Sequence, residues 1–96
     1  MGLCFEWDRR KAIANLRKHG VSFDEASTLF HDPLATIFDD DDHSGDEPRE
    51  IAVGHSITGR LLLVSFVERT ENVIRIISAR QTTTHERDDY EKKQYH

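Results

Sequence analysis

The sequence predicts an α+β fold in which an antiparallel sheet is accompanied by two N-terminal helices and one C-terminal helix, in the order β-α-α-β-β-β-β-α. Residues 61–67 and 73–79 form the two longest apolar runs, and each is short and rich in β-branched or bulky residues, as strands are. The connection around residues 70–72 is too short for a crossover helix, so the two runs should form an antiparallel hairpin. Helix signals on both sides of this hairpin complete the prediction.

The N-terminal third predicts one strand, residues 3–7, and two helices. Asp8 is a suitable N-cap for a first helix that ends near His19, before Gly20. Ser22 and Glu25 match a capping box for a second helix, which should stop before Asp32-Pro33. We expect apolar side chains at helical spacing to face the core: Ala12, Ile13, Leu16, Phe23, Ala26, Leu29 and Phe30.

The rest of the chain predicts strands on both sides of an acidic loop and a terminal helix. Residues 34–38 and 50–57 should be strands, separated by the acidic loop 39–48. Thr58-Gly59 is a two-residue turn signal before the hairpin. Thr83 and Glu86 match a second capping box, which starts a helix of about a dozen residues. Its apolar stripe is thin, with Tyr90 as the main contact, so it should pack weakly.

Length and composition indicate a single domain spanning residues 1–96. Charged residues make up 32% of the chain and hydrophobic residues 36%, which is typical of a small soluble globular protein. No apolar run approaches the roughly 18 residues of a membrane span, and the N-terminus lacks the apolar region of a signal peptide. The sequence therefore predicts a cytoplasmic protein without membrane contact.

The net charge of −5 is unevenly distributed. Residues 32–50 carry eight acidic residues and one basic residue, so the remainder of the chain is net positive. Basic clusters occur at residues 9–11 and at Arg17-Lys18. Because local fields depend on where the charges lie, a basic groove that binds nucleic acid can coexist with the acidic loop.

The hairpin places its charged residues at two ends of the sheet. Arg60 begins the first strand and Arg80 ends the second, so both should lie at one end, close to the N-terminus of the last helix. Two arginines there could bind a phosphate; alternatively they are solvated, with a partner such as Glu86. Glu68 and Arg69 should lie at the other end, on the order of 20 Å away at about 3.3 Å per residue.

Lys18-His19 closes the first helix and allows two interpretations. Cations in a last turn interact favourably with the helix dipole. A histidine beside a lysine also suits proton transfer at a phosphate. Metal or cofactor binding is not predicted: the six histidines lack paired ligand spacing, and residues 39–42 lack the alternating ligands and the glycine of a calcium loop.

Two motifs are the most specific in the chain, K-H-G-V-S-F at residues 18–23 and R-I-I-S-A-R at residues 75–80. With further matches over nearly the whole chain, they resemble the BrnT family of bacterial toxins. Departures are few: the aspartate run 39–42 and Pro48 fall in the variable loop, and Asp88-Asp89 replaces more basic residues in the last helix.

The resemblance implies a RelE-like ribonuclease toxin that works without a metal and inhibits translation and growth. It also implies a BrnA-type ribbon-helix-helix antitoxin that neutralises the toxin in a dimeric or higher complex. Matches to the family's motif positions occur at Lys18, His19, Glu68, Arg69 and Arg80, while Arg60 is added by the hairpin geometry. Our hypothesis assigns catalysis to Lys18, His19, Arg60 and Arg80, and substrate binding to Glu68, Arg69 and His85.

An alternative function belongs to a different class. The acidic loop and the thin terminal helix could make the chain a non-catalytic interaction module that binds a basic partner through that loop. The two functions differ in whether the free protein cleaves RNA.

Overall fold

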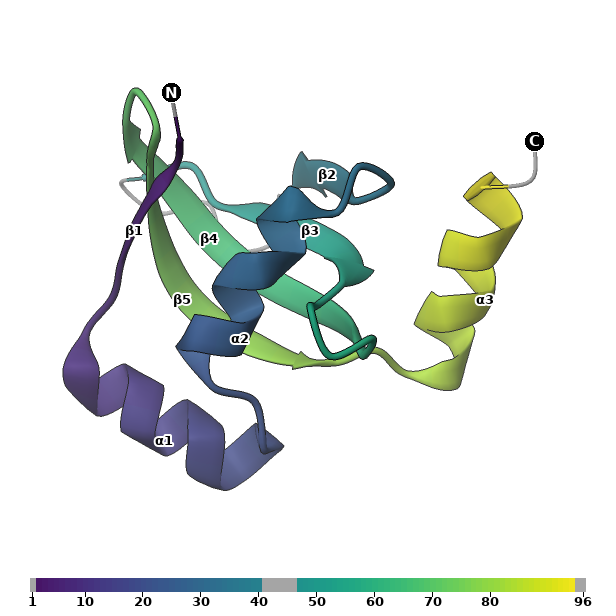
Figure 1. Ribbon diagram of the computed structural model, residues 1–96, viewed down its shortest axis with the longest axis horizontal. Helices are drawn as coiled ribbons and strands as arrows, with labels where there is room; N and C mark the ends of the chain where they lie inside the picture. Colours follow the sequence, from purple (N-terminus) through teal and green to yellow (C-terminus); the bar gives the residue numbers. More distant parts are fainter. Residues whose placement is uncertain (1, 41–46, 95–96) are drawn as a thin grey trace.

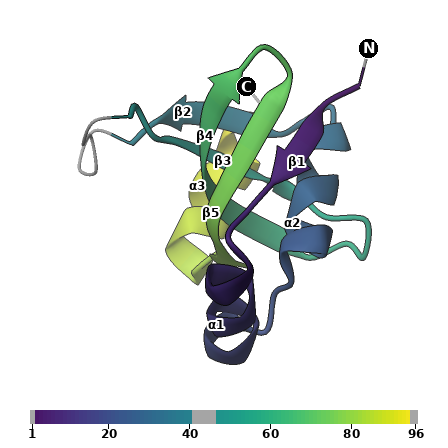
Figure 2. The same ribbon diagram turned by 90° about the vertical axis from the view of Figure 1, so that its left-hand side faces the viewer.

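The computed structural model describes residues 2–40 and 47–94, which form a five-stranded sheet with helices on both faces (Figure 1). α2 and α3 lie on opposite sides of the sheet, and α1 lies near one end of it (Figure 2). The order of the elements confirms the predicted α+β sequence. They are β1 (Cys4–Glu6), α1 (Arg9–His19), α2 (Phe23–Thr28), the short 3-10 helix η1 (Leu29–His31), β2 (Thr36–Asp39), β3 (Glu50–His55), β4 (Leu61–Thr70), β5 (Val73–Gln81) and α3 (Thr84–Gln94).

The sheet is mixed, and this corrects one part of the prediction. Its strand order is β1-β5-β4-β3-β2, and β2 through β5 pair antiparallel. β1 pairs parallel with β5, with Phe5 opposite Ile74. No turn joins β1 to its neighbour, because α1, α2 and three strands intervene in the sequence. The direction of β1 is therefore set by how α1 and α2 pack rather than by a local signal.

The β4–β5 hairpin is the centre of the sheet, as predicted, and both of its faces are covered. One face is buried under α2 in a cluster that includes Leu62, Val64 and Ile76. The other face contributes Leu61 to a smaller cluster with Tyr90 of α3. Two covered faces explain why apolar residues occur at successive positions along β4 rather than at alternate ones.

α1 begins and ends as the sequence predicts, but it buries a different side. The Asp8 side chain accepts a hydrogen bond from Lys11 N, and Gly20 adopts the left-handed conformation with φ of 69°. Ile13 and Leu16 were expected to face the core, yet they are 46% and 50% exposed. The prediction was wrong because α1 packs at the edge of the sheet, where a polar contact takes the place of an apolar face.

That polar contact is made by Asn15, which is buried. Its Nδ2 donates to the carbonyls of Ala79 at 2.8 Å and Val21 at 3.0 Å, and its Oδ1 accepts from Ala79 N at 3.1 Å. β1 pairs only with residues 73–75 of β5. Asn15 therefore satisfies the backbone of β5 beyond the end of β1, and it fixes the last turn of α1 beside residues 77–79.

α2 and α3 follow their capping signals to different extents. Ser22 Oγ accepts from Glu25 N at 3.0 Å, but the Glu25 side chain binds elsewhere, so only half of the first capping box forms. The second box is complete: Glu86 N donates to Thr83 Oγ1 at 3.1 Å, and Thr83 N donates to Glu86 Oε1 at 2.8 Å. No helix in the described part of the chain is long and apolar enough to cross a membrane.

Candidate functional site

A basic hollow lies between α1 and β5. It has a volume of about 230 Å³ and is lined by Lys11, Ala14, Asn15, Lys18, His19, Ile77 and Ser78. We call it the basic hollow because its ionisable lining consists of two lysines and a histidine, without a carboxylate. Lys11, Asn15 and Lys18 recur at i, i+4 and i+7, which places them in one row on the helix. The Asn15 contacts with Ala79 hold this row against β5.

Arg60 lies beside the end of α1, on the face of the sheet that α2 covers. Its Nη2 donates to the carbonyl of Gly20 at 3.1 Å, so it lies next to the residue that follows His19. Its Nε donates to Glu25 Oε2 at 2.9 Å, and Nη2 also pairs with Glu25 Oε1. The charge of Arg60 is thus compensated, and its guanidinium ties the α1–α2 turn to the start of β4.

Glu25 is the acceptor at the centre of this contact. Besides Arg60, it accepts from the hydroxyls of Ser56 and Thr58, each at 2.7 Å. The hydrogen bond from Arg60 is the main reason that the pKa of Glu25 is lowered to about 2, and the two hydroxyls add to the effect. The network joins α2 to the β3–β4 turn, although its members are far apart in the sequence.

Acid is expected to destabilise the protein through Glu25. A carboxyl whose pKa is lower in the folded than in the unfolded chain favours the folded state above the unfolded value of 4.5. This contribution, on the order of 2 kcal/mol, disappears as the pH falls from about 4.5 toward about 2. Urea unfolding over that range should show the loss, and Glu25→Gln should flatten the profile. A variant with the unaltered pH dependence would contradict the assignment.

Arg80 lies at the same end of the sheet as Arg60 but on the opposite face. It pairs with Leu63 in the hairpin, on the α3 side. Its guanidinium makes a bidentate pair with Glu86, Nη1 to Oε1 at 2.8 Å and Nη2 to Oε2 at 2.9 Å. This pair lowers the pKa of Glu86 to about 2. The two arginines therefore share an end of the sheet, as expected, but the structure does not bring them together as one clamp.

The remaining predicted site residues are placed as follows. Glu68 and Arg69 are exposed at the turn end of the hairpin, where Arg69 Nε lies 3.4 Å from Glu47 Oε2. They are on the order of 20 Å from Arg60 at about 3.3 Å per residue. His85 lies in the first turn of α3, with a side chain that is 87% exposed and 3.4 Å from Asp89.

Sequence reasoning assigned only Lys18 and His19 of the basic hollow to the site, so five of its lining residues were missed, Lys11 and Ser78 among them. Lys11 could have been found, because it shares a helical row with Lys18 once Asn15 is taken as the contact residue. Ser78 could not, because its place depends on how α1 meets the edge of β5.

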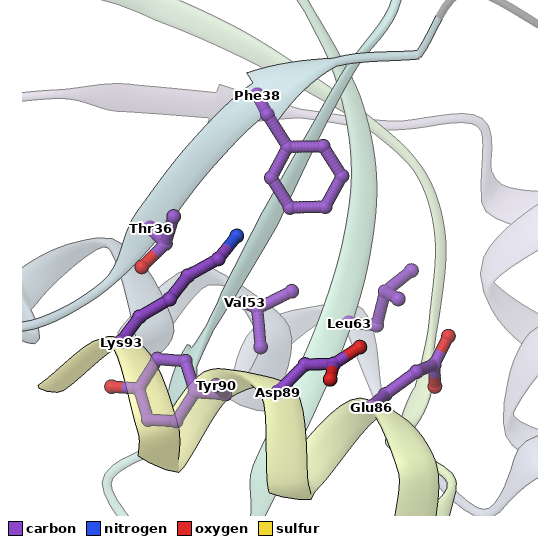
Figure 3. Close-up of a pocket in the computed structure, with 8 residues that line it drawn as sticks. All are labelled: Thr36, Phe38, Val53, Leu63, Glu86, Asp89, Tyr90 and Lys93. Carbon is purple, nitrogen blue, oxygen red and sulfur yellow. The ribbon is translucent and has the colours of Figure 1, made fainter.

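A second cavity lies between α3 and the sheet (Figure 3). Its volume is about 130 Å³, with Val53 and Leu63 on the sheet side and Tyr90 on the helix side. Two carboxylates of α3, Glu86 and Asp89, also line it, together with one cation, Lys93. Carboxylates repel a phosphate, so the basic hollow, whose lining holds cations without a carboxylate, is the more suitable surface for a phosphate group. Within residues 2–40 and 47–94, no group of three or more His, Cys, Asp or Glu side chains is placed to hold a metal ion.

Comparison with models of known protein families identifies the family of this chain. The family model described as "Ribonuclease toxin, BrnT, of type II toxin-antitoxin system" matches residues 7–86. The chain belongs to the BrnT family. The matched range contains every predicted site residue, and the type II assignment implies an antitoxin partner. A search among curated protein sequences returns no match.

A solved structure shows the same fold as this BrnT family member. The crystal structure of the Brucella abortus ribonuclease toxin BrnT superposes with a TM-score of 0.65. The alignment covers 85% of this chain and 99% of that one, with 21% sequence identity. The likeness confirms the predicted α+β fold with the element order β-α-α-β-β-β-β-α.

Proposed function

We propose that the chain is an endoribonuclease toxin that cleaves RNA without a metal ion at the basic hollow, and thereby inhibits translation and growth. The class of activity is supported by the family match over residues 7–86. The location is supported by one observation: Lys11, Lys18 and His19 converge on a hollow whose lining contains no carboxylate. Such a surface attracts the phosphodiester backbone, which carries one negative charge per nucleotide.

The groups in the hollow match the needs of RNA cleavage. The 2′-oxygen attacks the adjacent phosphorus and loses its proton, while the bond from phosphorus to the 5′-oxygen breaks and that oxygen gains a proton. His19 is the group that accepts or donates a proton, and Lys18 stabilises the extra negative charge that develops on the phosphoryl oxygens. The products are a 2′,3′-cyclic phosphate, or its hydrolysed form, and a 5′-hydroxyl.

The two arginines have different roles in this proposal. Arg60 positions His19, because it holds the Gly20 carbonyl next to it while its own charge is compensated by Glu25. Arg80 follows Ala79, which contacts Asn15 of the hollow, but its side chain binds Glu86 on the other face. To reach a phosphate, Arg80 has to leave Glu86. Glu68, Arg69 and His85 lie outside the hollow, and their contact with substrate stays a prediction.

An RNA cleavage assay tests the activity. The purified chain, freed of its antitoxin, is incubated with a labelled single-stranded RNA in the presence of excess EDTA. We expect cleavage that leaves 5′-hydroxyl ends, together with growth arrest when the chain is expressed alone. Intact RNA at high protein concentration, both with EDTA and with added Mg²⁺, would contradict a ribonuclease and favour the interaction module. The loop of that alternative includes residues 41–46, which lie outside the described residues.

The antitoxin of the proposal is a BrnA-like ribbon-helix-helix protein. Type II membership implies a protein partner, while its fold and stoichiometry are part of the proposal. Co-expression with the neighbouring reading frame, followed by purification and mass measurement of the complex, tests both. The RelE-like classification belongs to the same proposal.

A further inference from the structure

An apolar groove lies on the side of α1 that faces away from the basic hollow. Its volume is about 180 Å³, and it is lined by Trp7, Ala12, Ile13, Leu16, Ser22, Phe23 and Asp24. We call it the α1 groove. Two of its lining rings contact each other: the ring of Trp7 meets that of Phe23 edge-on at a centroid distance of 5.9 Å. Ile13 and Leu16 are about half exposed, so their apolar surface in the groove is left uncovered by the described part of the chain.

Arginines surround the exposed apolar residues of this groove. On a helix the neighbours of a residue are three and four positions away. For Ile13 these neighbours are Arg9 and Arg10 on one side and Leu16 and Arg17 on the other. α1 contains no acidic residue at all, although the whole chain has a net charge of −5. The one carboxylate that lines the groove is Asp24, at the start of α2.

The chemistry of the α1 groove fits a polypeptide better than RNA or a lipid surface. Single-stranded RNA binds by stacking its bases on exposed aromatic faces. The accessible aromatic ring of this groove, Trp7, is half-buried and packs edge-on against Phe23, and the most exposed apolar groups are the aliphatic Ile13 and Leu16. An interfacial membrane helix needs a long apolar face, and α1 exposes two large apolar side chains. An apolar pocket with a charged rim is the usual anchor point of a protein interface.

We propose that the α1 groove docks an acidic segment of the antitoxin, whose apolar side chain enters between Trp7 and Leu16 while its carboxylates meet Arg9, Arg10 and Arg17. The occupant follows from charge complementarity on α1 and from the protein partner that the type II family implies. The inference rests on that family assignment, and it does not require the basic hollow to be catalytic. The same helix supplies Lys18 and His19. An antitoxin docked on α1 therefore lies beside the proposed RNA site.

A pair of double variants tests this docking site. Ile13→Glu/Leu16→Glu puts two carboxylates in the groove, and the matched control Ile37→Glu/Ile57→Glu changes two side chains that are 52% and 81% exposed on β2 and the β3–β4 turn. Affinity for the antitoxin encoded by the adjacent reading frame is measured by calorimetry, and folding by thermal melting. We expect the groove variant to weaken binding by roughly 100-fold and the control to leave it unchanged.

Two further measurements distinguish the other occupants. Arg9→Glu/Arg17→Glu should weaken antitoxin binding most at low salt, because screening reduces charge attraction. RNA cleavage by the groove variant, without antitoxin, should equal that of the unaltered chain. Unchanged antitoxin affinity in a folded groove variant would overturn the proposal. So would a loss confined to RNA binding, or to binding of vesicles of phosphatidylcholine and phosphatidylglycerol. Absence of cleavage in every variant would refute only the proposed function.

Discussion

Replacing His19 by alanine is expected to slow RNA cleavage by roughly 100-fold or more, without loss of the fold. The imidazole is half-buried in the lining of the basic hollow, where its ring nitrogens can both accept and donate a proton. Its removal leaves Lys11 and Lys18 to bind the phosphate, so RNA affinity should change much less than the cleavage rate. Single-turnover rates and RNA binding measured on the same preparations separate the two effects.

The matched control is His31→Ala. His31 is an exposed histidine in η1 and does not line the basic hollow. This variant should cleave RNA at the unaltered rate, whereas the His19 variant should cleave it far more slowly. Equal cleavage by both variants, with equal melting temperatures, would remove His19 from the mechanism.

Replacing Asn15 by aspartate is expected to lower the free energy of unfolding by about 3 kcal/mol at neutral pH. The new carboxylate can still accept from Ala79 N, but it loses both donated hydrogen bonds and faces the carbonyls of Ala79 and Val21. A buried charge opposite two carbonyl oxygens is destabilising. Acid should partly restore stability relative to the unaltered chain, because a protonated carboxyl can again donate one of these bonds.

Asn72→Asp provides the control for this change. Asn72 lies in the β4–β5 turn with φ of 68°, a conformation that both asparagine and aspartate tolerate. Denaturant unfolding of the two variants at neutral pH should show a large loss for position 15 and a small one for position 72. Similar losses at the two positions would mean that the Asn15 side chain contributes little to joining α1 to β5.

Local signals predicted most of the fold, and contacts between distant segments account for the rest. The hairpin, the Gly20 end of α1 and the Thr83–Glu86 capping box depend on residues within a few positions of one another. The parallel direction of β1 and the exposure of Ile13 and Leu16 depend instead on where α1 meets β5. An asparagine within an amphipathic helix gives no local sign that it will be the buried residue.

The sequence predicts where the two arginines lie along the hairpin, but not the face of the sheet on which each one lies. Hairpin pairing correctly places Arg60 and Arg80 at one end of the sheet. The side of the sheet on which each guanidinium lies follows from its partner, and Glu25 is 35 residues from Arg60 in the sequence. The nearer partner of Arg80, Glu86, was predictable because it is six residues away in the following helix turn. The roles of these arginines in RNA cleavage stay predictions.

The side-chain amide of Asn15 affects how readily another copy of this protein can pair with the edge of the sheet. Unpaired strand edges invite pairing with another chain and so promote aggregation. At one side of this sheet, β1 pairs with residues 73–75 of β5. Farther along β5, the Asn15 side chain bonds both the carbonyl and the N–H of Ala79, as the backbone of a neighbouring strand would. A strand from another chain therefore cannot pair with residues 73–75 or with Ala79 of β5. At the opposite edge is β2, only four residues long, where Ile37 and Phe38 are about half exposed. Strand-mediated self-association of the described fold is therefore limited to the outer edges of β1, which is three residues long, and of β2.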